Sequence, residues 1–244
     1  ITIITSYIYF QVLSEPILIL ILLSYYIFTL IIFSYLAKQR SEMVDEIVSS
    51  KANMRVYSNI HDTYPDMGGI IRNSLQSGEG TEVVVLGLTL YHMWYYMKNF
   101  LQDNSTSNLR LVFCVMDSSS SILSGLNRKW CKRADDYISE IQEYLDTNIN
   151  DLEKREIEIH IYKYCHPPIV HGMLINNKHL FLSFTQWNWQ KDSMEGAENF
   201  YVYYNSKTSV GKKHIHMFNN WVGHIKSRKC ENLCLKEITK PNDI

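Results

Sequence analysis

A run of 22 residues without a single charge, Pro16 to Ala37, constrains this chain more than any other feature of its sequence. At about 1.5 Å of rise per residue, a helix of this length covers a hydrocarbon core of roughly 30 Å. The run is longer than the roughly 7 to 15 apolar residues of a signal peptide, and it lacks a small-residue cleavage site. It therefore predicts a transmembrane helix over residues 16–37.

The flanks of this run predict an orientation. Lys38 and Arg40 follow it directly and no basic residue precedes it, so the positive-inside rule places the later part of the chain in the cytoplasm. Residues 1–13 are also apolar, and they are either the end of an earlier helix or the edge of a fragment. The sequence thus predicts a membrane anchor over 1–37 with the lipid bilayer as a partner, a juxtamembrane helix within 38–53, and a cytoplasmic domain over 54–244.

Charge in the predicted domain is balanced. Of the 25 acidic residues only Glu15 precedes Lys38, and all 24 basic residues lie from Lys38 onward. This balance argues against a global electrostatic attraction to nucleic acid. Locally, however, a basic cluster surrounds Trp130, and such a cluster either meets phosphates or is a solvated helix face. Its members are Arg128, Lys129, Lys132 and Arg133.

Cysteine usage indicates neither a disulfide framework nor a metal site. The five cysteines are an odd number and show no CxxC spacing, although Cys230 and Cys234 lie near His224. A structural zinc site normally needs four ligands, and no second pair matches. Phosphate-binding and dinucleotide-binding glycine motifs are also missing. We therefore expect no metal and no cofactor.

Strand and helix patterns alternate along the domain. The β-branched run from Glu82 to Leu88 predicts a buried strand, a helix follows from Leu90 to Gln102, and Leu109 to Asp117 predicts a second buried strand. Because a helix crossover joins them, we expect these two strands to be parallel neighbours. Together with the later segments this predicts an α/β fold with a mixed, largely parallel sheet flanked by helices. The later segments are a helix over 129–145, a strand over 156–164, a hairpin of 170–175 and 179–184, a strand over 200–204 and a helix over 212–228.

This order of elements, together with the stretch VHGMLINNKHLFLSFTQWNW, resembles one half of the phospholipase D superfamily over roughly residues 55–228. That family carries a His-x-Lys-x4-Asp motif followed by a small polar turn. The resemblance places His171 where the family has its nucleophilic histidine, and Met173 where it has the lysine. The turn from Asn176 to Lys178 replaces the one that bears the aspartate.

The resemblance also implies which residues line a ligand site around His171. The turn contributes Asn176 and Lys178, and the small polar turn contributes Ser183, Thr185 and Gln186. A phosphodiester gains negative charge on its nonbridging oxygens as it is attacked, so the loss of the lysine removes a cation that the reaction needs. Active members use two such histidines, so one copy of this motif implies a homodimer if the domain is active.

Three functions follow for the domain. The first is a degenerate phospholipase D-like domain, anchored in a membrane, that binds a phosphate-containing ligand such as an anionic lipid headgroup or nucleic acid, in signalling or defence. The second is an active dimeric phosphodiesterase, a nuclease or phospholipase, with His171 as the catalytic residue. The third is a tethered nucleotide-sensing effector. For His171 itself, catalysis, binding without turnover and a hydrogen-bonded core position all stay open.

Overall fold

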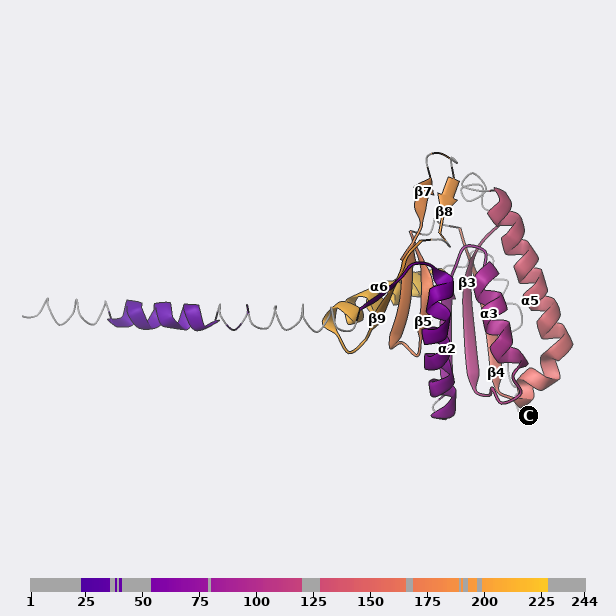
Figure 1. The fold of residues 1–244 in the computed structure, drawn as a ribbon, viewed down its shortest axis with the longest axis horizontal. Coiled ribbons are helices and arrows are strands. Elements are labelled where there is room, and N and C mark those ends of the chain that lie inside the picture. The colour runs from indigo at the N-terminus through magenta and orange to yellow at the C-terminus, as the bar shows by residue number, and fades with distance from the viewer. Residues whose placement is uncertain are drawn as a thin grey trace, which may run out of the picture. The chain divides into compact units, whose positions relative to one another are not determined.

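The computed structural model describes residues 23–35, 38, 40, 54–78, 80–119, 128–165, 169–188, 190, 193–196 and 199–227. The chain divides into two compact units, Ile1–Lys51 and Ala52–Ile244. The second unit carries the sheet and its helices (Figure 1).

In the first unit, residues 23–35 are helical and their side chains are largely exposed. Among the described residues, no helix combines the length and the apolar character that a membrane crossing needs. This finding corrects the predicted transmembrane helix over 16–37 and the membrane localisation derived from it. The rest of that run and most of the predicted helix within 38–53 lie outside the described residues.

A seven-stranded mixed sheet forms the centre of the second unit, in the order β1-β9-β6-β5-β2-β3-β4. Two further short strands, β7 and β8, pair with each other. The strands are β1 (Arg55–Tyr57), β2 (Thr81–Leu86), β3 (Leu109–Met116), β4 (Ile157–Tyr164), β5 (Val170–Ile175), β6 (His179–Phe184), β7 (Gln186–Asn188), β8 (Ser193–Glu195) and β9 (Tyr201–Asn205).

Strand direction divides the sheet into two halves. The neighbours β2–β3 and β3–β4 are parallel, whereas β1–β9, β9–β6, β6–β5 and β5–β2 are antiparallel. The α/β class and the mixed sheet are as predicted, but the prediction of a largely parallel sheet is wrong. The reason is that β5 follows β4 in the chain yet pairs with β2 on the other side of the sheet, and every later strand is then added antiparallel.

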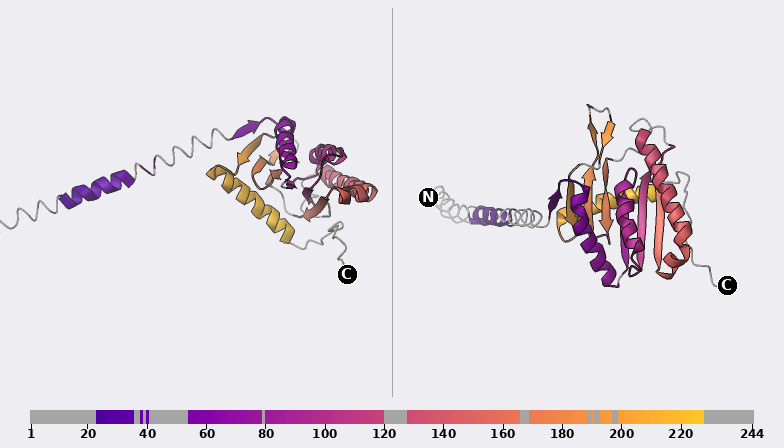
Figure 2. Two further views of the ribbon diagram at one scale, coloured as in Figure 1. Left: turned by 90° about the horizontal axis from the view of Figure 1, so that it is seen from below. Right: turned by 45° about the vertical axis from the view of Figure 1, so that its right-hand side comes forward.

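Helices cover both faces of the sheet (Figures 1 and 2). Those on one face are α2 (Ile60–Gln76), α3 (Tyr91–Gln102) and α5 (Arg128–Lys154), and α6 (Ser209–Ser227) lies on the other. α5 is longer than the predicted helix over 129–145, because its amphipathic pattern continues to Lys154. The resemblance predicts that the strand from Ile157 to Tyr162 runs next to the hairpin, and this prediction is wrong, because β4 lies at the sheet edge next to β3.

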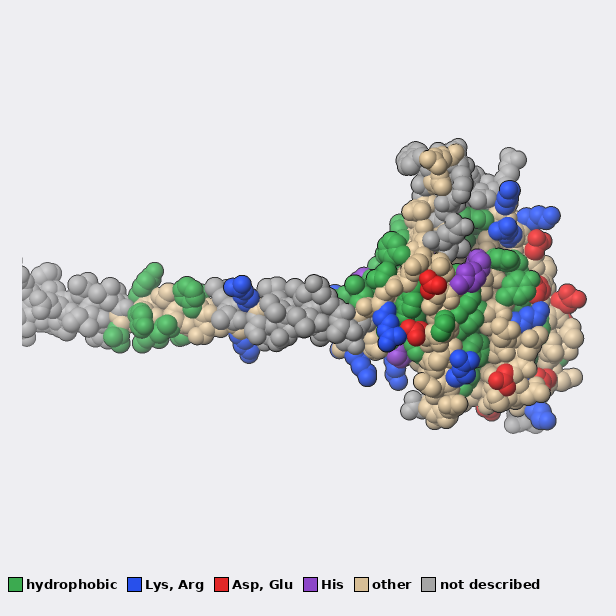
Figure 3. All heavy atoms as spheres, in the orientation of Figure 1, with side chains coloured by type: hydrophobic (Ala, Val, Ile, Leu, Met, Phe, Trp, Pro, Cys, Tyr) green, Lys and Arg blue, Asp and Glu red, His purple; other side chains and the backbone are tan. Residues whose placement is uncertain are grey.

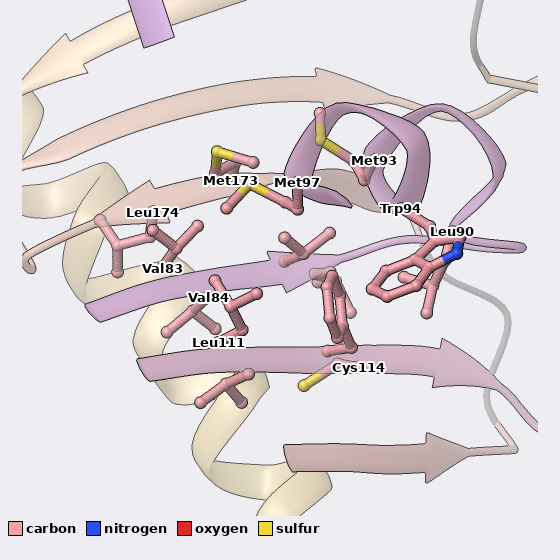
Figure 4. Close-up of a cluster of buried hydrophobic side chains, with 14 of the residues drawn as sticks. Val83, Val84, Leu90, Met93, Trp94, Met97, Leu111, Cys114, Met173 and Leu174 are labelled. Atoms are coloured by element: carbon pink, nitrogen blue, oxygen red, sulfur yellow. The ribbon is translucent and has the colours of Figure 1, made fainter. Parts of the chain in front are cut away.

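The core confirms the predicted pairing of the two buried strands. Val83 aligns with Leu111 in a parallel register, and Val84 is only 5% exposed, as expected for a strand covered on both faces. On the face toward α3, methionines fill the space between sheet and helix, with Met173 of β5 beside Met97 (Figure 4). This packing leaves the strand ends, rather than the strand centres, as places for a ligand.

Candidate functional site

His171 lies near the start of β5, on the first strand of the predicted hairpin. The hairpin turns at Asn176 to Lys178 as expected, and His171 pairs directly with Ser183 of β6. Because β5 is antiparallel to β2, this end of the hairpin meets the carboxyl end of β2, where Gly172 aligns with Leu86. His171 is therefore placed at a strand end, where open α/β sheets bind ligands.

The imidazole of His171 is buried, and neither Nδ1 nor Nε2 makes a hydrogen bond of ordinary geometry among the described residues, although the Gly196 backbone lies close enough to interact with the ring. Its side chain is 8% exposed. Burial lowers the pKa of His171 to about 4, and the nearby Gly196 backbone only partly offsets this effect. The ring is thus neutral at neutral pH. Buried polar groups are almost always satisfied, so an unpartnered imidazole indicates a ligand or water at this position.

The segment from Leu86 to Leu90 connects β2 to α3 and forms one wall beside His171. Two hydrogen bonds to neighbouring strands fix this segment: the Gly87 nitrogen donates to the Cys114 carbonyl, and the Tyr164 hydroxyl donates to the Gly87 carbonyl. Leu90 has φ +60, a left-handed conformation that costs a leucine roughly 1 to 2 kcal/mol. Strain of this kind persists where the surrounding structure fixes it, often at functional sites.

α3 begins directly after this strained residue and has no side-chain cap. Its N-cap residue is Leu90, which offers no oxygen to the first backbone amides, and no acidic residue lies in the first turn. Those amides keep the partial positive charge of a helix N-terminus. The start of α3, at Tyr91, His92 and Met93, lines the same pocket as His171. An anion is the ligand that such an end prefers.

Two charged or titratable side chains complete the pocket. Arg133 of α5 lines it, with its guanidinium carbon 5.7 Å from the centre of the Tyr91 ring. His92 is half-buried, and its pKa is lowered first by burial and then by the charges of His61 and Arg133. On the face that α2, α3 and α5 cover, histidine lies among basic and acidic side chains that are interspersed (Figure 3). The pocket itself receives Arg133 and therefore favours negative charge.

These groups enclose a pocket of about 110 Å³, well above the roughly 10 to 15 Å³ that one water needs. Its walls come from the ends of β2 and β5, the starts of α3 and α5, and Gly196. Trp130 and Tyr201 supply aromatic surface, and Tyr201 meets the His171 ring edge to face at 5.4 Å. The arrangement offers an anion one neutral imidazole, one arginine, one partly buried histidine and an uncapped helix end.

Asn176 and Lys178, the ligand residues predicted from the turn, lie at the opposite end of the hairpin. Five residues of strand, about 17 Å, separate Asn176 from His171. The Asn176 Oδ1 accepts a hydrogen bond from the Glu82 nitrogen at 2.8 Å. The Lys178 nitrogen donates to the Ile175 carbonyl and closes the turn. The structure does not bring these two residues to His171.

The other three predicted residues lie near the His171 end. Ser183 is buried opposite His171, but its hydroxyl donates to the Phe200 carbonyl at 2.8 Å. The Thr185 nitrogen donates to the Ile169 carbonyl, and Gln186 is exposed on β7. None of the three lines the pocket around His171.

Met173 takes the position that the resemblance assigns to a lysine. Its side chain is fully buried beneath α3 and does not line the pocket. The core therefore holds a thioether where the family reaction would use a cation. Within the described residues, the cation nearest to that role in the pocket is Arg133, which comes from a different element.

Sequence reasoning found part of this site. It singled out His171, and it included Arg133 in the basic cluster around Trp130 that could meet phosphates. It missed His92 and the uncapped start of α3. Leu90 carries no capping signal, and its lack of an N-cap oxygen is visible only once the helix boundary is known.

Comparisons with known proteins give structural matches only. No family model matches the chain, and no curated protein matches it. Phosphatidylserine synthase from Haemophilus influenzae is similar over 59% of this chain and 32% of its own, at 9% identity and a TM-score of 0.36. NucT from Helicobacter pylori is similar over 71% and 94%, at 9% identity and 0.30. Both have the phospholipase D-like fold.

A third match is TrmBL2, an archaeal chromatin protein whose structure shows a mode of DNA binding. It is similar over 78% of this chain and 60% of its own, at 8% identity and a TM-score of 0.34. The chain spans about a third of the length of the phosphatidylserine synthase. The TM-scores of these matches, 0.30 to 0.36, are too low to carry an argument about function. We therefore base the function on the geometry of the chain itself.

Proposed function

We propose that the pocket at the carboxyl end of β2 binds a phosphodiester or another phosphate-containing group, with little or no hydrolysis. The observation that carries this proposal is the buried, unpartnered His171 in a pocket that also receives Arg133 and the uncapped start of α3. A lipid headgroup and a nucleic acid backbone share this chemistry. Phosphate oxygens accept hydrogen bonds from the guanidinium, the helix amides and the imidazole.

The roles of the residues follow from their chemistry. Arg133 supplies a permanent charge in a forked geometry that suits phosphate oxygens. The neutral His171 donates one hydrogen bond from the floor of the pocket and keeps the second nitrogen as an acceptor. Tyr91 and Trp130 shield the group from water at the rim. Ligand binding thereby satisfies the polar atoms that the unliganded chain leaves without partners.

Slow hydrolysis is expected because charge stabilisation is incomplete. The attacking group and the nonbridging oxygens need several fixed donors or cations, and Met173 contributes none from the core. The competing possibility, a phosphodiesterase that uses His171 as the nucleophile, is favoured by one feature, the neutral imidazole. Turnover is therefore measured together with binding.

The test is titration calorimetry of the whole chain with dimethyl phosphate, a diester without a ring. We expect Arg133→Gln to weaken binding by about 10- to 100-fold, since a hydrogen bond to a charged group contributes about 1.5 to 3 kcal/mol. Lys132→Gln, one residue away on α5 and not part of the pocket, is the matched control and should leave the affinity unchanged. Equal losses in both variants would reject the site.

Turnover is tested with bis(4-nitrophenyl) phosphate, from which hydrolysis releases a coloured phenolate. We expect His171→Gln to weaken dimethyl phosphate binding and to change the low rate of phenolate release little. A robust rate that His171→Gln abolishes would instead establish the phosphodiesterase, because general acid–base and nucleophilic roles are worth factors of about 10² to 10⁴.

A further inference from the structure

A second hollow lies on the same face of the sheet, between α2 and α3. It has a volume of about 750 Å³, within the range of roughly 300 to 1,000 Å³ typical of small-molecule sites. Tyr64, Gly68 and Arg72 line it from α2, and Tyr96 and Asn99 line it from α3. None of these residues belongs to the pocket around His171. We call this hollow the α2–α3 groove.

Gly68 keeps the groove open at its floor. A Cβ built on Gly68 would lie 2.9 Å from the Tyr96 hydroxyl and 3.2 Å from the Arg72 Nη2, so both side chains lean over the bare backbone. Gly69, the next residue, has nothing within 4 Å of such a Cβ. A glycine inside a helix costs about 1 kcal/mol relative to alanine, and only at Gly68 do close neighbours require it.

Stacked tyrosines form the apolar wall of the groove. The rings of Tyr64 and Tyr96 stack at 4.4 Å with an interplanar angle of 14°. The Tyr64 hydroxyl donates to the His92 carbonyl, and the Tyr96 hydroxyl donates to the Tyr64 carbonyl. Because both hydroxyl protons are already used, these side chains offer flat ring surface to a ligand rather than donors.

Arg72 supplies charge beside this wall. Its side chain is exposed, and it forms no ion pair or hydrogen bond with any other described residue. Asp103 also lines the groove, but its Oδ1 accepts hydrogen bonds from the Ser105 nitrogen and hydroxyl. A guanidinium with five donors next to an aromatic wall matches a ligand that carries an anionic group on a flat ring.

We propose that the α2–α3 groove is a second ligand site, distinct from the phosphate pocket, for a small organic anion with an aromatic ring. The anion pairs with Arg72, and the ring packs against the Tyr64–Tyr96 wall. His61 lines the groove, and its ring lies 5.0 Å from that of His92, which lines the phosphate pocket. The two sites thus share a wall, yet each has its own cation.

Titration calorimetry of the whole chain with 1-naphthalenesulfonate tests this proposal, with methanesulfonate as the anion without a ring. We expect saturable binding of the naphthalene compound and weaker binding of methanesulfonate. Arg72→Gln should weaken naphthalenesulfonate binding about tenfold, as for loss of a charged hydrogen bond. Gly68→Ala should weaken it as well, whereas Gly69→Ala should leave it unchanged.

The same titration separates the groove from the phosphate pocket. Arg133→Gln removes the cation of the pocket and should not change the affinity for 1-naphthalenesulfonate. If Arg72→Gln binds the probe as the unmodified chain does, or if Gly69→Ala loses as much affinity as Gly68→Ala, the groove is not the site. Should Gly68→Ala fail to fold, the exposed Arg72→Gln variant still decides the matter, with circular dichroism confirming its fold.

Discussion

Polar side chains lie at both ends of the β5–β6 hairpin. The asparagines at the turn have hydrogen-bond partners, whereas the His171 imidazole at the other end lacks one of ordinary geometry among the described residues. At the turn, the Asn176 Oδ1 accepts from the Glu82 nitrogen, and the Asn177 Oδ1 accepts from the Asn219 amide. At the other end, the buried ring nitrogens of His171 have no such bond within the described part of the chain. The turn asparagines have their hydrogen bonds in place before any ligand arrives, whereas the His171 imidazole does not.

This difference separates a structural polar residue from a functional one. Asn176 and Asn177 have φ values of +50 and +53, a conformation that asparagine tolerates better than most residues. Their side chains then tie the turn to β2 and α6. His171 receives no such bonds, so its polarity has no structural purpose within the described residues. The comparison predicts that changes to the turn asparagines affect stability but not binding, whereas changes to the His171 side chain affect binding and the pH dependence of stability.

The largest expected effect is that of Gly172→Ala, next to His171. A Cβ on Gly172 would collide with the Phe181 carbonyl oxygen and lie 3.1 Å from the Leu182 Cα, both of them backbone atoms of the paired strand. We expect a loss of about 3 kcal/mol in the free energy of unfolding, the upper end of the usual range for overpacking, since the strand backbone cannot move aside. Urea unfolding measures it. Gly223→Ala, with nothing within 4 Å, is the control and should not destabilise the chain.

The second effect is the pH dependence that His171 brings to stability. Burial lowers its pKa from 6.5 to about 4, so between these pH values the unfolded chain binds a proton that the folded chain does not. Stability from this group is present above pH 6.5 and is lost as the pH falls to about 4, by about 3 kcal/mol in total.

Urea unfolding at a series of pH values checks this slope. In His171→Gln, which does not titrate, the part of the slope due to this group should disappear. A slope that is identical in the two chains would mean that the imidazole is solvated, and the contrast between the two hairpin ends would then be lost. Dimethyl phosphate should reduce the slope as well, because a bound anion favours the protonated imidazole.

At the turn, Asn176→Ala should cost about 1 to 2 kcal/mol. The substitution removes the oxygen that accepts from the Glu82 nitrogen. It also places alanine, which tolerates a positive φ less well than asparagine, at φ +50. Asn176→Asp, which keeps an oxygen at this position, should lose less. Thermal and urea unfolding give the stabilities, and the affinity for dimethyl phosphate should be the same in all three chains. A changed affinity would place the turn in the ligand site.

The smallest expected effect is that of Lys178→Gln. Lys178 contributes its backbone to the turn, where its nitrogen donates to the Ile175 carbonyl and its carbonyl accepts from the Ser206 nitrogen. A surface substitution of this kind usually changes stability by less than about 0.5 kcal/mol. Calorimetry with dimethyl phosphate should show no loss. A tenfold weaker affinity would support the ligand role that the sequence motif implied for this residue.

Local patterns account for what the sequence could predict. The β-branched run around Val84 and the helix after it indicated a buried parallel pair, and the pair of apolar runs around Asn176 and Asn177 indicated a hairpin. Strand order is not a local property. β4 joined the far edge of the sheet because it extends the parallel half beyond β3, and nothing in its alternation of polar and apolar residues distinguishes the two edges.

For the site as well, the sequence predicted only the residues that a local pattern marks. His171 was found because a motif surrounds it in the sequence, and Arg133 because it lies in a basic cluster. His92 joins them only because α3 starts at the strand end that β5 reaches from the other direction. The motif suggested that Asn176 and Lys178 would act with His171, but a strand that runs straight for six residues carries the two ends apart. Spacing along a strand, rather than proximity in sequence, decides which residues meet.

The buried Met173 limits which substitutions this strand can accept. Met97 lies beside it and Met93 nearby in the same cluster, and the side chain is fully enclosed (Figure 4). A single mutation to lysine would now place an ammonium group in a space shaped for thioethers, at an expense of several kcal/mol for an unpaired charge. A lysine at this position would first need smaller neighbours on α3. The close packing around Met173 therefore restricts the chain, and its close variants, to chemistry that needs no cation on this strand.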